Sequence, residues 1–334
     1  MKDIFFSVIT LVYNTKEEYL RTCLDSLRSI NYDNKEFIII NDGSNEETSK
    51  ILEEYKPLLN ATLINQENKG ISASRMIALS IAKGDYILFV DSDDIADSNG
   101  LLDLNNIIKD FNPDLIHFDD FKFKKTLDNI VSNHNYVPEG IIDKDLAIEE
   151  VCKLHINGVS NKVAKKELFA GIENYINTSY INGEDFQQTT FLVLNSNNVY
   201  FTRKPINYYR ITEEPKTYYV DNIIRDTNYL VPGYKMLFEL SKTNDKHLAT
   251  FKEYAQKSIV YYGFKLCNMC DSFVKTKETL DELNKQEIVN ILKKIECRTS
   301  FVSNLLFTLL TKKKYLTFLV LAKLYKLVFG FDEL

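Results

Sequence analysis

The chain has 334 residues with 47 acidic and 41 basic side chains, which give a formal net charge of −6. A hydrophobic content of 45% excludes a disordered chain, and 11 glycines are too few for a collagen-like or low-complexity protein. The mild acidity argues against a nucleic-acid partner, since a dedicated nucleic-acid-binding protein would carry a basic stripe.

Strands and helices alternate in the first 90 residues. Apolar runs rich in β-branched and aromatic residues predict strands at 5–12, 36–40, 61–65 and 86–90. Apolar residues at helical spacing predict helices over 17–30, 45–55 and 71–82. Another strand is expected at 114–121. This alternation is typical of βαβ units, so we expect an α/β fold with a mostly parallel central sheet covered by helices.

The second half of the chain has a different pattern. Beyond about residue 143 the sequence becomes more helical, and no convincing strand follows Tyr229. We therefore predict an α/β domain over residues 1–218 and a C-terminal helical region over 219–334.

The last helical segment has an unusual charge. Residues 301–331 contain five lysines and no acidic residue, so this tail carries +5 and the rest of the chain carries −6 − 5 = −11. On one continuous helix, Lys312, Lys323 and Lys326 would share a face. Basic and apolar residues in this combination are typical of helices that lie on an anionic membrane. Packing of this helical pair on the protein body is the alternative.

The cysteines and the N-terminal residues indicate the cellular compartment in which the protein is expected. Five cysteines at irregular spacing do not resemble a disulfide framework, and residues 1–4 lead into the first strand without a visible signal peptide. We expect a cytoplasmic protein that lies peripherally on the inner face of the plasma membrane.

Polar residues follow three of the predicted strands. Asn14 ends the first strand, Asp42 ends the second, and residues 91–94 (Asp-Ser-Asp-Asp) follow the strand at 86–90. Ligands of open α/β sheets bind at this carboxyl edge. Crowded carboxylates repel one another, and oxygen ligands suit Mg²⁺ or Mn²⁺ held together with phosphates. The sequence therefore favours a metal-bridged diphosphate, with a helix N-cap at residues 91–94 as the alternative.

Two further patterns bear on the chemistry. Neither GxGxxG after the first strand nor a GxxxxGK[ST] loop occurs, which excludes the usual dinucleotide and P-loop sites. Glu184 and Asp185 precede the apolar run at 191–194. They either complement the dipole of a helix or present a general base, and their spacing does not decide between these readings.

Five sequence blocks carry a family resemblance. They are SVITLVYN at 7–14, INDGS at 40–44, NKGISASR at 68–75, FVDSDD at 89–94 and GED at 183–185. Together they resemble the inverting glycosyltransferases of family 2, of the bacterial capsule, lipooligosaccharide and teichoic-acid type. The resemblance implies the GT-A nucleotide-diphospho-sugar transferase fold. It also implies a metal-dependent hexosyl transfer from a UDP-sugar to a hydroxyl of a glycan or lipid-linked glycan acceptor.

The resemblance also implies which residues bind the donor. Leu11 and Tyr13 would hold the uracil, with Tyr13 stacked on it, and Asp42 would accept a hydrogen bond from the uracil N–H. Asn68 and Arg75 would fix the nucleotide and its diphosphate.

The remaining implied roles belong to the acidic residues and Ser92. Asp91 and Ser92 would contact the ribose, and Asp93 would bind Mn²⁺ or Mg²⁺. Asp185 would be the general base and Glu184 would orient the acceptor.

Several positions depart from the family pattern. The family often has Pro where Leu11 stands, Trp where Ser160 stands, and Ser where Pro215 stands. The last two lie in the acceptor region, so the identity of the acceptor is not carried over. A non-catalytic scaffold or glycan-binding subunit, and a sugar nucleotidyltransferase, are the alternative functions. The sequence leaves a homodimer open.

Overall fold

The computed structural model describes residues 3–133, 137–153, 155–156, 158–176, 183–211, 224, 227–240, 245–270, 272–296 and 299–329. The chain forms two compact units. The first unit comprises Met1–Ala147 and Ile156–Glu214, and the second comprises Ile148–His155 and Pro215–Leu334. The predicted boundary between residues 218 and 219 lies outside the described residues.

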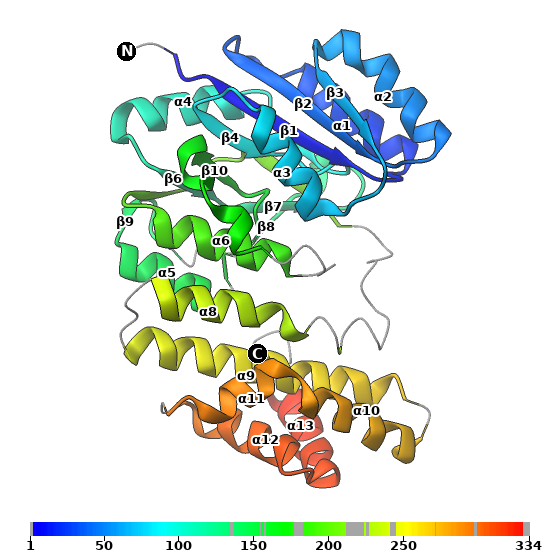
Figure 1. Cartoon of the computed structure of the whole chain (residues 1–334), viewed down its shortest axis with the longest axis vertical. Coiled ribbons are helices and arrows are strands. Elements are labelled where there is room, and N and C mark those ends of the chain that lie inside the picture. The colour runs from blue at the N-terminus through cyan, green and yellow to red at the C-terminus, as the bar shows by residue number, and fades with distance from the viewer. Residues whose placement is uncertain are drawn as a thin grey trace. The chain divides into compact units, whose positions relative to one another are not determined.

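The first unit is built on an eight-stranded sheet with the order β3-β2-β1-β4-β10-β6-β11-β9 (Figure 1). Its first four strands are parallel: β1 (Phe6–Val12), β2 (Lys35–Asp42), β3 (Thr62–Gln66) and β4 (Tyr86–Phe89). Because β1 lies between β2 and β4, the loops after these three strands meet at one edge of the sheet. The predicted α/β class with a mostly parallel sheet is confirmed.

Most of the other strands of this sheet were not predicted from the sequence. β10 (Lys162–Lys165) lies antiparallel between β4 and β6 (Leu115–Phe118), and β11 (Val199–Thr202) is parallel to β6 and antiparallel to β9 (Gly140–Ile142). Each of these segments has three or four residues, which is too short for a periodic pattern to be read.

A second, four-stranded sheet has the order β5-β12-β7-β8. Its strands are β5 (Ile95–Ala96), β7 (Asp120–Phe123), β8 (Val131–Asn133) and β12 (Asn207–Arg210). The single strand expected at 114–121 is therefore two strands, β6 and β7, in different sheets. β5 directly follows residues 91–94, which we call the acidic loop, and so ties the end of that loop to the second sheet.

Helices of the first unit cover the main sheet: α1 (Glu17–Arg28), α2 (Glu46–Leu59), α3 (Ile71–Ile81), α4 (Gly100–Phe111), the start of α5 (Lys144–Cys152) and α6 (Glu184–Asn195). α1 buries Leu20, Leu24 and Leu27 completely in a core shared with β1 and β2. Each such side chain contributes about 1.5–3 kcal/mol on burial.

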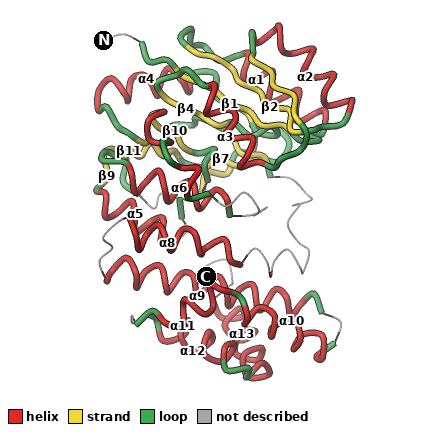
Figure 2. Tube along the Cα trace, viewed as in Figure 1, coloured by secondary structure: helices red, strands yellow, loops and turns green. Residues whose placement is uncertain are grey.

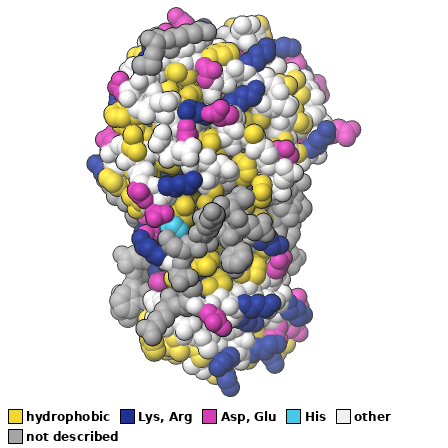
Figure 3. Space-filling model, turned by 60° about the vertical axis from the view of Figure 1, so that its left-hand side comes forward, with side chains coloured by type: hydrophobic (Ala, Val, Ile, Leu, Met, Phe, Trp, Pro, Cys, Tyr) yellow, Lys and Arg dark blue, Asp and Glu magenta, His cyan; other side chains and the backbone are white. Residues whose placement is uncertain are grey.

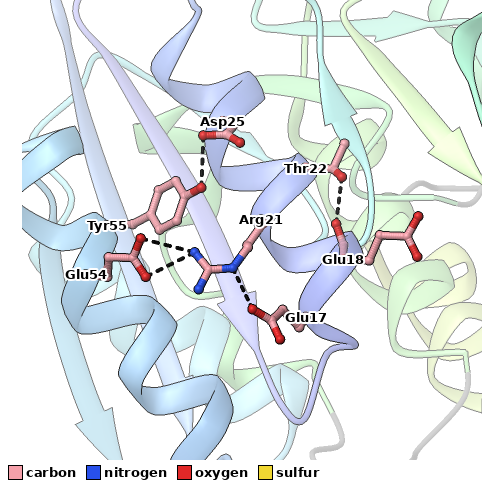
Figure 4. Close-up of polar contacts among 7 residues, drawn as sticks. All are labelled: Glu17, Glu18, Arg21, Thr22, Asp25, Glu54 and Tyr55. Carbon is pink, nitrogen blue, oxygen red and sulfur yellow. Dashed lines mark hydrogen bonds and ion pairs between the residues drawn. The ribbon is translucent and has the colours of Figure 1, made fainter.

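The exposed faces of α1 and α2 are joined by a polar network (Figure 4). Arg21 forms ion pairs with Glu17 at 2.7 Å and Glu54 at 3.0 Å, and the Tyr55 hydroxyl donates to Asp25 at 2.9 Å. Such exposed pairs each contribute at most about 1 kcal/mol.

The described part of the second unit contains helices and no strand, as expected (Figure 2). The helices are α8 (Leu230–Leu240), α9 (Asp245–Asn268), α10 (Phe273–Lys285), α11 (Glu287–Lys294), α12 (Phe301–Thr311) and α13 (Tyr315–Phe329). Across the described residues, none of the helices combines the length and the apolar character needed to cross a membrane.

The lysines of the tail are arranged differently from the prediction. α12 ends at Thr311 and α13 begins at Tyr315, so residues 312–314 form the turn between two helices. The expectation that Lys312 shares one helical face with Lys323 and Lys326 was therefore wrong. It assumed a continuous helix, whereas Lys313 adopts a left-handed backbone with φ of 59°.

Candidate active site

The loops after β1, β2 and β4 are in direct contact. Asn14 has a left-handed backbone with φ of 49°, and its N–H donates to Ser44 Oγ at 3.1 Å. The N–H of Asn45 donates to Asn14 Oδ1 at 2.8 Å, and the hydroxyls of Thr15 and Ser92 lie 2.6 Å apart. The structure therefore gathers the polar strand ends into one rim.

Asp42 is buried at this rim and organises a neighbouring loop. Its Oδ1 accepts from Gln66 Nε2 at 2.7 Å and from the N–H of Lys69 at 2.8 Å, while Oδ2 accepts from the N–H of Gly70 at 2.9 Å. Asn68 lies exposed in the middle of this loop. This internal role of Asp42 was not predicted, because it depends on main-chain donors that no side-chain motif reveals.

Gly43 allows this loop to pass close to β2. It has φ of 74°, and a Cβ placed on it would lie 2.6 Å from the main-chain nitrogen of Asn68. Tyr13, after β1, keeps 46% of its surface exposed, and Leu11 is half-buried. The ring of Tyr13 is thus open to a planar ligand.

The acidic loop is a turn, closed by a hydrogen bond from the N–H of Asp94 to Asp91 O at 3.0 Å. It leads into β5, so the alternative of a helix N-cap at this point was wrong. Asp91, Ser92 and Asp93 are half-buried, whereas Asp94 is 2% exposed.

The acidic loop is electrostatically crowded. Burial, with the nearby charges of Asp185 and Asp93, raises the pKa of Asp91 to about 6, although Arg75 and a hydrogen bond from Ser160 act against this shift. Burial and the charge of Asp91 likewise raise the pKa of Asp94 well above its ordinary value. A cation at the loop would relieve this repulsion.

A buried ion pair connects α3 to α6. Arg75 is 2% exposed, and its Nη1 donates to Asp185 Oδ1 at 2.6 Å. Burial alone would lower the pKa of Arg75, but the charges of Asp185, Glu184 and Asp91 outweigh it and raise the pKa. The side chain of Asp185 remains 34% exposed, so its carboxylate is both held by a cation and accessible.

Glu184 begins α6 and is almost completely buried. Burial, followed by the neighbouring charge of Asp185, raises its pKa to about 7, and its Oε2 has no hydrogen-bond partner among the described residues. Both acids lie in the first helical turn, where the helix dipole favours negative charge.

Three residues at the rim were not selected from the sequence. Thr15 contacts Ser92, the Ser160 hydroxyl contacts Asp91, and the side chain of Arg210 donates to the acidic loop. Ser160 was noticed only as a departure from a family pattern, and no local signal in the sequence connects Thr15 or Arg210 with the acidic loop. Across the described residues no group of three His, Cys, Asp or Glu side chains is arranged to hold a metal ion by itself.

Comparison with known proteins identifies the first unit. Residues 7–172 match the family described as glycosyl transferase family 2. The chain carries a family 2 glycosyltransferase domain. The resemblance predicted from the five sequence blocks is confirmed.

Two relatives of this glycosyltransferase domain come from Bacillus subtilis and Streptococcus pneumoniae. The chain is 48% identical to EpsH of Bacillus subtilis over 89 residues, which are 26% of each protein. It is 27% identical to the glycosyltransferase GlyA of Streptococcus pneumoniae serotype 4 over 307 residues. That match covers 85% of this chain and 42% of GlyA, so the matched segment spans less than half of the length of either relative.

The fold of the family 2 glycosyltransferase domain and of the helical region recurs in a solved structure. Residues 1–349 of TarS from Staphylococcus aureus, in complex with UDP-GlcNAc, match with a TM-score of 0.79. The match covers 97% of this chain and 92% of that chain at 17% identity, which establishes a shared fold. TarS is named a poly(ribitol-phosphate) β-N-acetylglucosaminyltransferase. The expected GT-A fold with a helical C-terminal region is confirmed.

Proposed function

We propose that the protein transfers a sugar from a UDP-sugar to a hydroxyl of a glycan or lipid-linked glycan acceptor of a bacterial surface polysaccharide. The observation that carries the proposal is the rim itself, where Asp42, the acidic loop and the Arg75–Asp185 pair adjoin the loops of three parallel strands. The UDP-GlcNAc bound to TarS supports the donor class, and the name of TarS supports the acceptor class.

The donor would bind across the loops of β1, β2 and β3. Tyr13 offers an exposed ring for the uracil beside Leu11, and Asp42 holds the loop that presents Asn68. Asp91 and Ser92 would contact the ribose. Stacking on an aromatic ring contributes about 1–3 kcal/mol per base, so Tyr13 would supply a substantial part of the nucleotide affinity.

Asp93, next to Asp91, would hold Mn²⁺ or Mg²⁺ in the presence of the donor. Both residues are half-buried at the rim, and the pKa of Asp91 is raised by burial and by the charges of Asp185 and Asp93, whose repulsion a cation would relieve. Carboxylates with phosphate oxygens form the mixed ligand set that suits Mg²⁺ and Mn²⁺, so three protein ligands are not required. When bound, such an ion neutralises charge on the leaving diphosphate.

Asp185 would act as the general base. Arg75 holds Asp185 Oδ1 in place, while the exposed part of the carboxylate can accept the proton of the acceptor hydroxyl. The hydroxyl oxygen would then displace UDP directly and invert the anomeric centre. Glu184 is 9% exposed, so it would orient the acceptor only through the small part of its surface that remains open.

The test is release of UDP from a panel of UDP-sugars, with and without EDTA. Asp93→Ala and chelation should both abolish turnover, whereas Asp110→Ala, an exposed acid on α4 outside the rim, should leave it unchanged. Turnover that survives EDTA would refute the metal. A non-catalytic scaffold would release no UDP from any donor, and calorimetry with UDP and Mn²⁺ would then show whether the fold still binds the nucleotide.

We further propose that α13 attaches the protein to an anionic membrane, which would place it peripherally at the cytoplasmic face. Leu316, Val320 and Leu324 lie four residues apart along one side of the helix and are 67%, 52% and 52% exposed. Exposed lysines 312–314 precede this apolar stripe. Figure 3 shows Lys and Arg side chains beside exposed hydrophobic ones on the second unit, the combination that anionic lipid surfaces attract.

Co-sedimentation with vesicles tests the membrane proposal. The full chain should bind phosphatidylglycerol vesicles at low salt and neutral phosphatidylcholine vesicles much less. The double variant Leu316→Ser/Val320→Ser should lose this binding, while Phe273→Ser, an exposed apolar residue of α10, should retain it. Wild-type protein that ignores both vesicles, and forms a dimer that the double variant lacks, would show that the stripe is a subunit interface instead.

A further inference from the structure

Strand β12 contacts the segments on both sides of the acidic loop. Before the loop, Asn207 Nδ2 donates to Phe89 O, at the end of β4, at 3.2 Å. After the loop, β12 pairs antiparallel with β5, and the Tyr208 hydroxyl donates to Asp97 Oδ2 at 3.0 Å. β12 lies outside residues 7–172, so the family match does not include it.

Arg210, the last residue of β12, contacts the acidic loop itself. Its Nε donates to Asp93 O at 2.7 Å, and its main-chain N–H donates to Asp94 Oδ1 at 2.9 Å. One residue thereby fixes both the main chain of Asp93 and the side chain of Asp94. Since Arg210 is 4% exposed, these bonds are shielded from competition with water.

Two aromatic rings hold the guanidinium of Arg210 in place. Its central carbon lies 4.4 Å from the ring centroid of Tyr19, on α1, and 4.5 Å from that of Phe123, on β7. Stacking between rings suits the planar guanidinium and not the ammonium group of lysine. The two rings leave the guanidinium little room to move, which restricts the direction in which Nε–H points.

Packing alone does not explain an arginine at this position. Its Nη2 is buried and has no hydrogen-bond partner among the described residues, which costs about 1–3 kcal/mol for an ordinary donor and more for a charged one. An apolar side chain would fill the same space without this cost. The arginine therefore contributes an interaction that an apolar residue could not make. The hydrogen bond to the main chain of Asp93 is that interaction.

We propose that Arg210 is a positioning residue for the acidic loop. By fixing the main chain of Asp93, it sets where the Asp93 carboxylate stands at the rim, and its charge offsets part of the repulsion among the loop carboxylates. The benefit to metal binding rests on the proposed function, whereas the anchoring of the loop does not.

The experiment compares Arg210→Met, Arg210→Lys and the control Arg21→Met. Arg21 also has carboxylate partners and a nearby tyrosine ring, Tyr55 at 5.9 Å, but it lies on the exposed face of α1 (Figure 4). Two readouts are used on the full chain. Amide hydrogen exchange of residues 90–97 without ligand reports the anchoring, and electron paramagnetic resonance titration of Mn²⁺ with UDP present reports metal affinity.

Arg210→Met should accelerate exchange across residues 90–97 and weaken Mn²⁺ binding about 10–100-fold, the usual effect of removing a residue that orients a metal ligand. Arg210→Lys should weaken it less, because the charge remains while the planar Nε contact is lost. Arg21→Met should change neither readout. Exchange and Mn²⁺ affinity of Arg210→Met equal to those of the wild type would overturn the proposal.

Two other results are decisive as well. If wild-type protein binds no Mn²⁺ with UDP present, the proposed metal is wrong, and hydrogen exchange alone decides the positioning role. If Arg210→Met does not fold, Tyr19→Leu removes one ring from a half-buried position and should accelerate loop exchange by a smaller factor. Unchanged exchange in a folded Tyr19→Leu variant and in Arg210→Lys would overturn the proposal.

Discussion

Substitution can separate the structural role of Asp185, in its ion pair with Arg75, from its proposed role as the general base. Arg75 is 2% exposed, and its Nη1 lies 2.6 Å from Asp185 Oδ1. Asp185→Asn removes the charge and the basicity but keeps an oxygen that can accept from Arg75. Asp185→Ala also removes the acceptor, so the guanidinium stays buried without it.

The expected magnitudes follow from this geometry. Removing one partner of a buried ion pair costs about 3–5 kcal/mol. Because the side chain of Asp185 is 34% exposed, water can partly replace it, and we expect a loss of about 3 kcal/mol for Asp185→Ala. Asp185→Asn should lose about 1 kcal/mol, since a neutral hydrogen bond remains. Both variants should turn over about 10²–10⁴ times more slowly if Asp185 is the general base.

Three measurements separate the two roles: urea unfolding, the rate of UDP release at saturating donor, and calorimetric donor affinity. Arg75→Met in the Asp185→Ala background should recover part of the lost stability, because the unpaired charge is then gone. Equal stability of Asp185→Ala and Asp185→Asn would show that the pair does not stabilise the fold. Wild-type turnover in Asp185→Asn would eliminate Asp185 as the base.

The remaining predictions concern Glu184 and two glycines. Burial raises the pKa of Glu184 to about 7 from 4.5, so the folded state binds this proton more tightly and stability falls as pH rises between these values. The fall amounts to a few kcal/mol at about 1.4 kcal/mol per pKa unit, and it should shrink in Glu184→Gln when urea unfolding is followed against pH. Gly43→Ala would place a Cβ 2.6 Å from the nitrogen of Asn68 and should weaken calorimetric UDP binding about tenfold, or 1.4 kcal/mol; unchanged affinity would mean that this loop does not bind UDP. Gly84→Ala would place a Cβ 2.3 Å from the nitrogen of Ser7, at the opposite edge of the sheet, and should destabilise the fold by about 1–3 kcal/mol in urea without changing UDP affinity.

The first half of the fold could be predicted because its elements are long and periodic. β1 to β4 and α1 to α3 combine apolar strand cores with helical spacing, and each is present within a few residues of its expected bounds. The second sheet could not be predicted from local patterns. β5 has two residues and β12 four, and their pairing joins segments more than 100 positions apart.

The residues of the candidate site could likewise be predicted only in part. Asp42, the acidic loop and Asp185 could be selected because acids beside buried strands or at a helix start are visible locally. The partners of these acids could not be predicted from the sequence. Arg75 and Asp185 are 110 positions apart, and Arg210 and Asp93 are 117 apart, so only tertiary packing brings them together.

The charge balance of the rim gives a physical reason to expect a divalent cation. The two buried arginines are already engaged, Arg75 by the Asp185 carboxylate and Arg210 by the main-chain oxygen of Asp93. Even so, burial and, after it, the charges of neighbouring carboxylates raise the pKa values of Asp91 and Asp94, so both groups lie where negative charge is disfavoured. A nucleotide diphosphate would add further negative charge at the same place. Its binding would therefore be opposed unless another cation entered with it, and an ion shared between the acidic loop and the diphosphate is the arrangement that neutralises both.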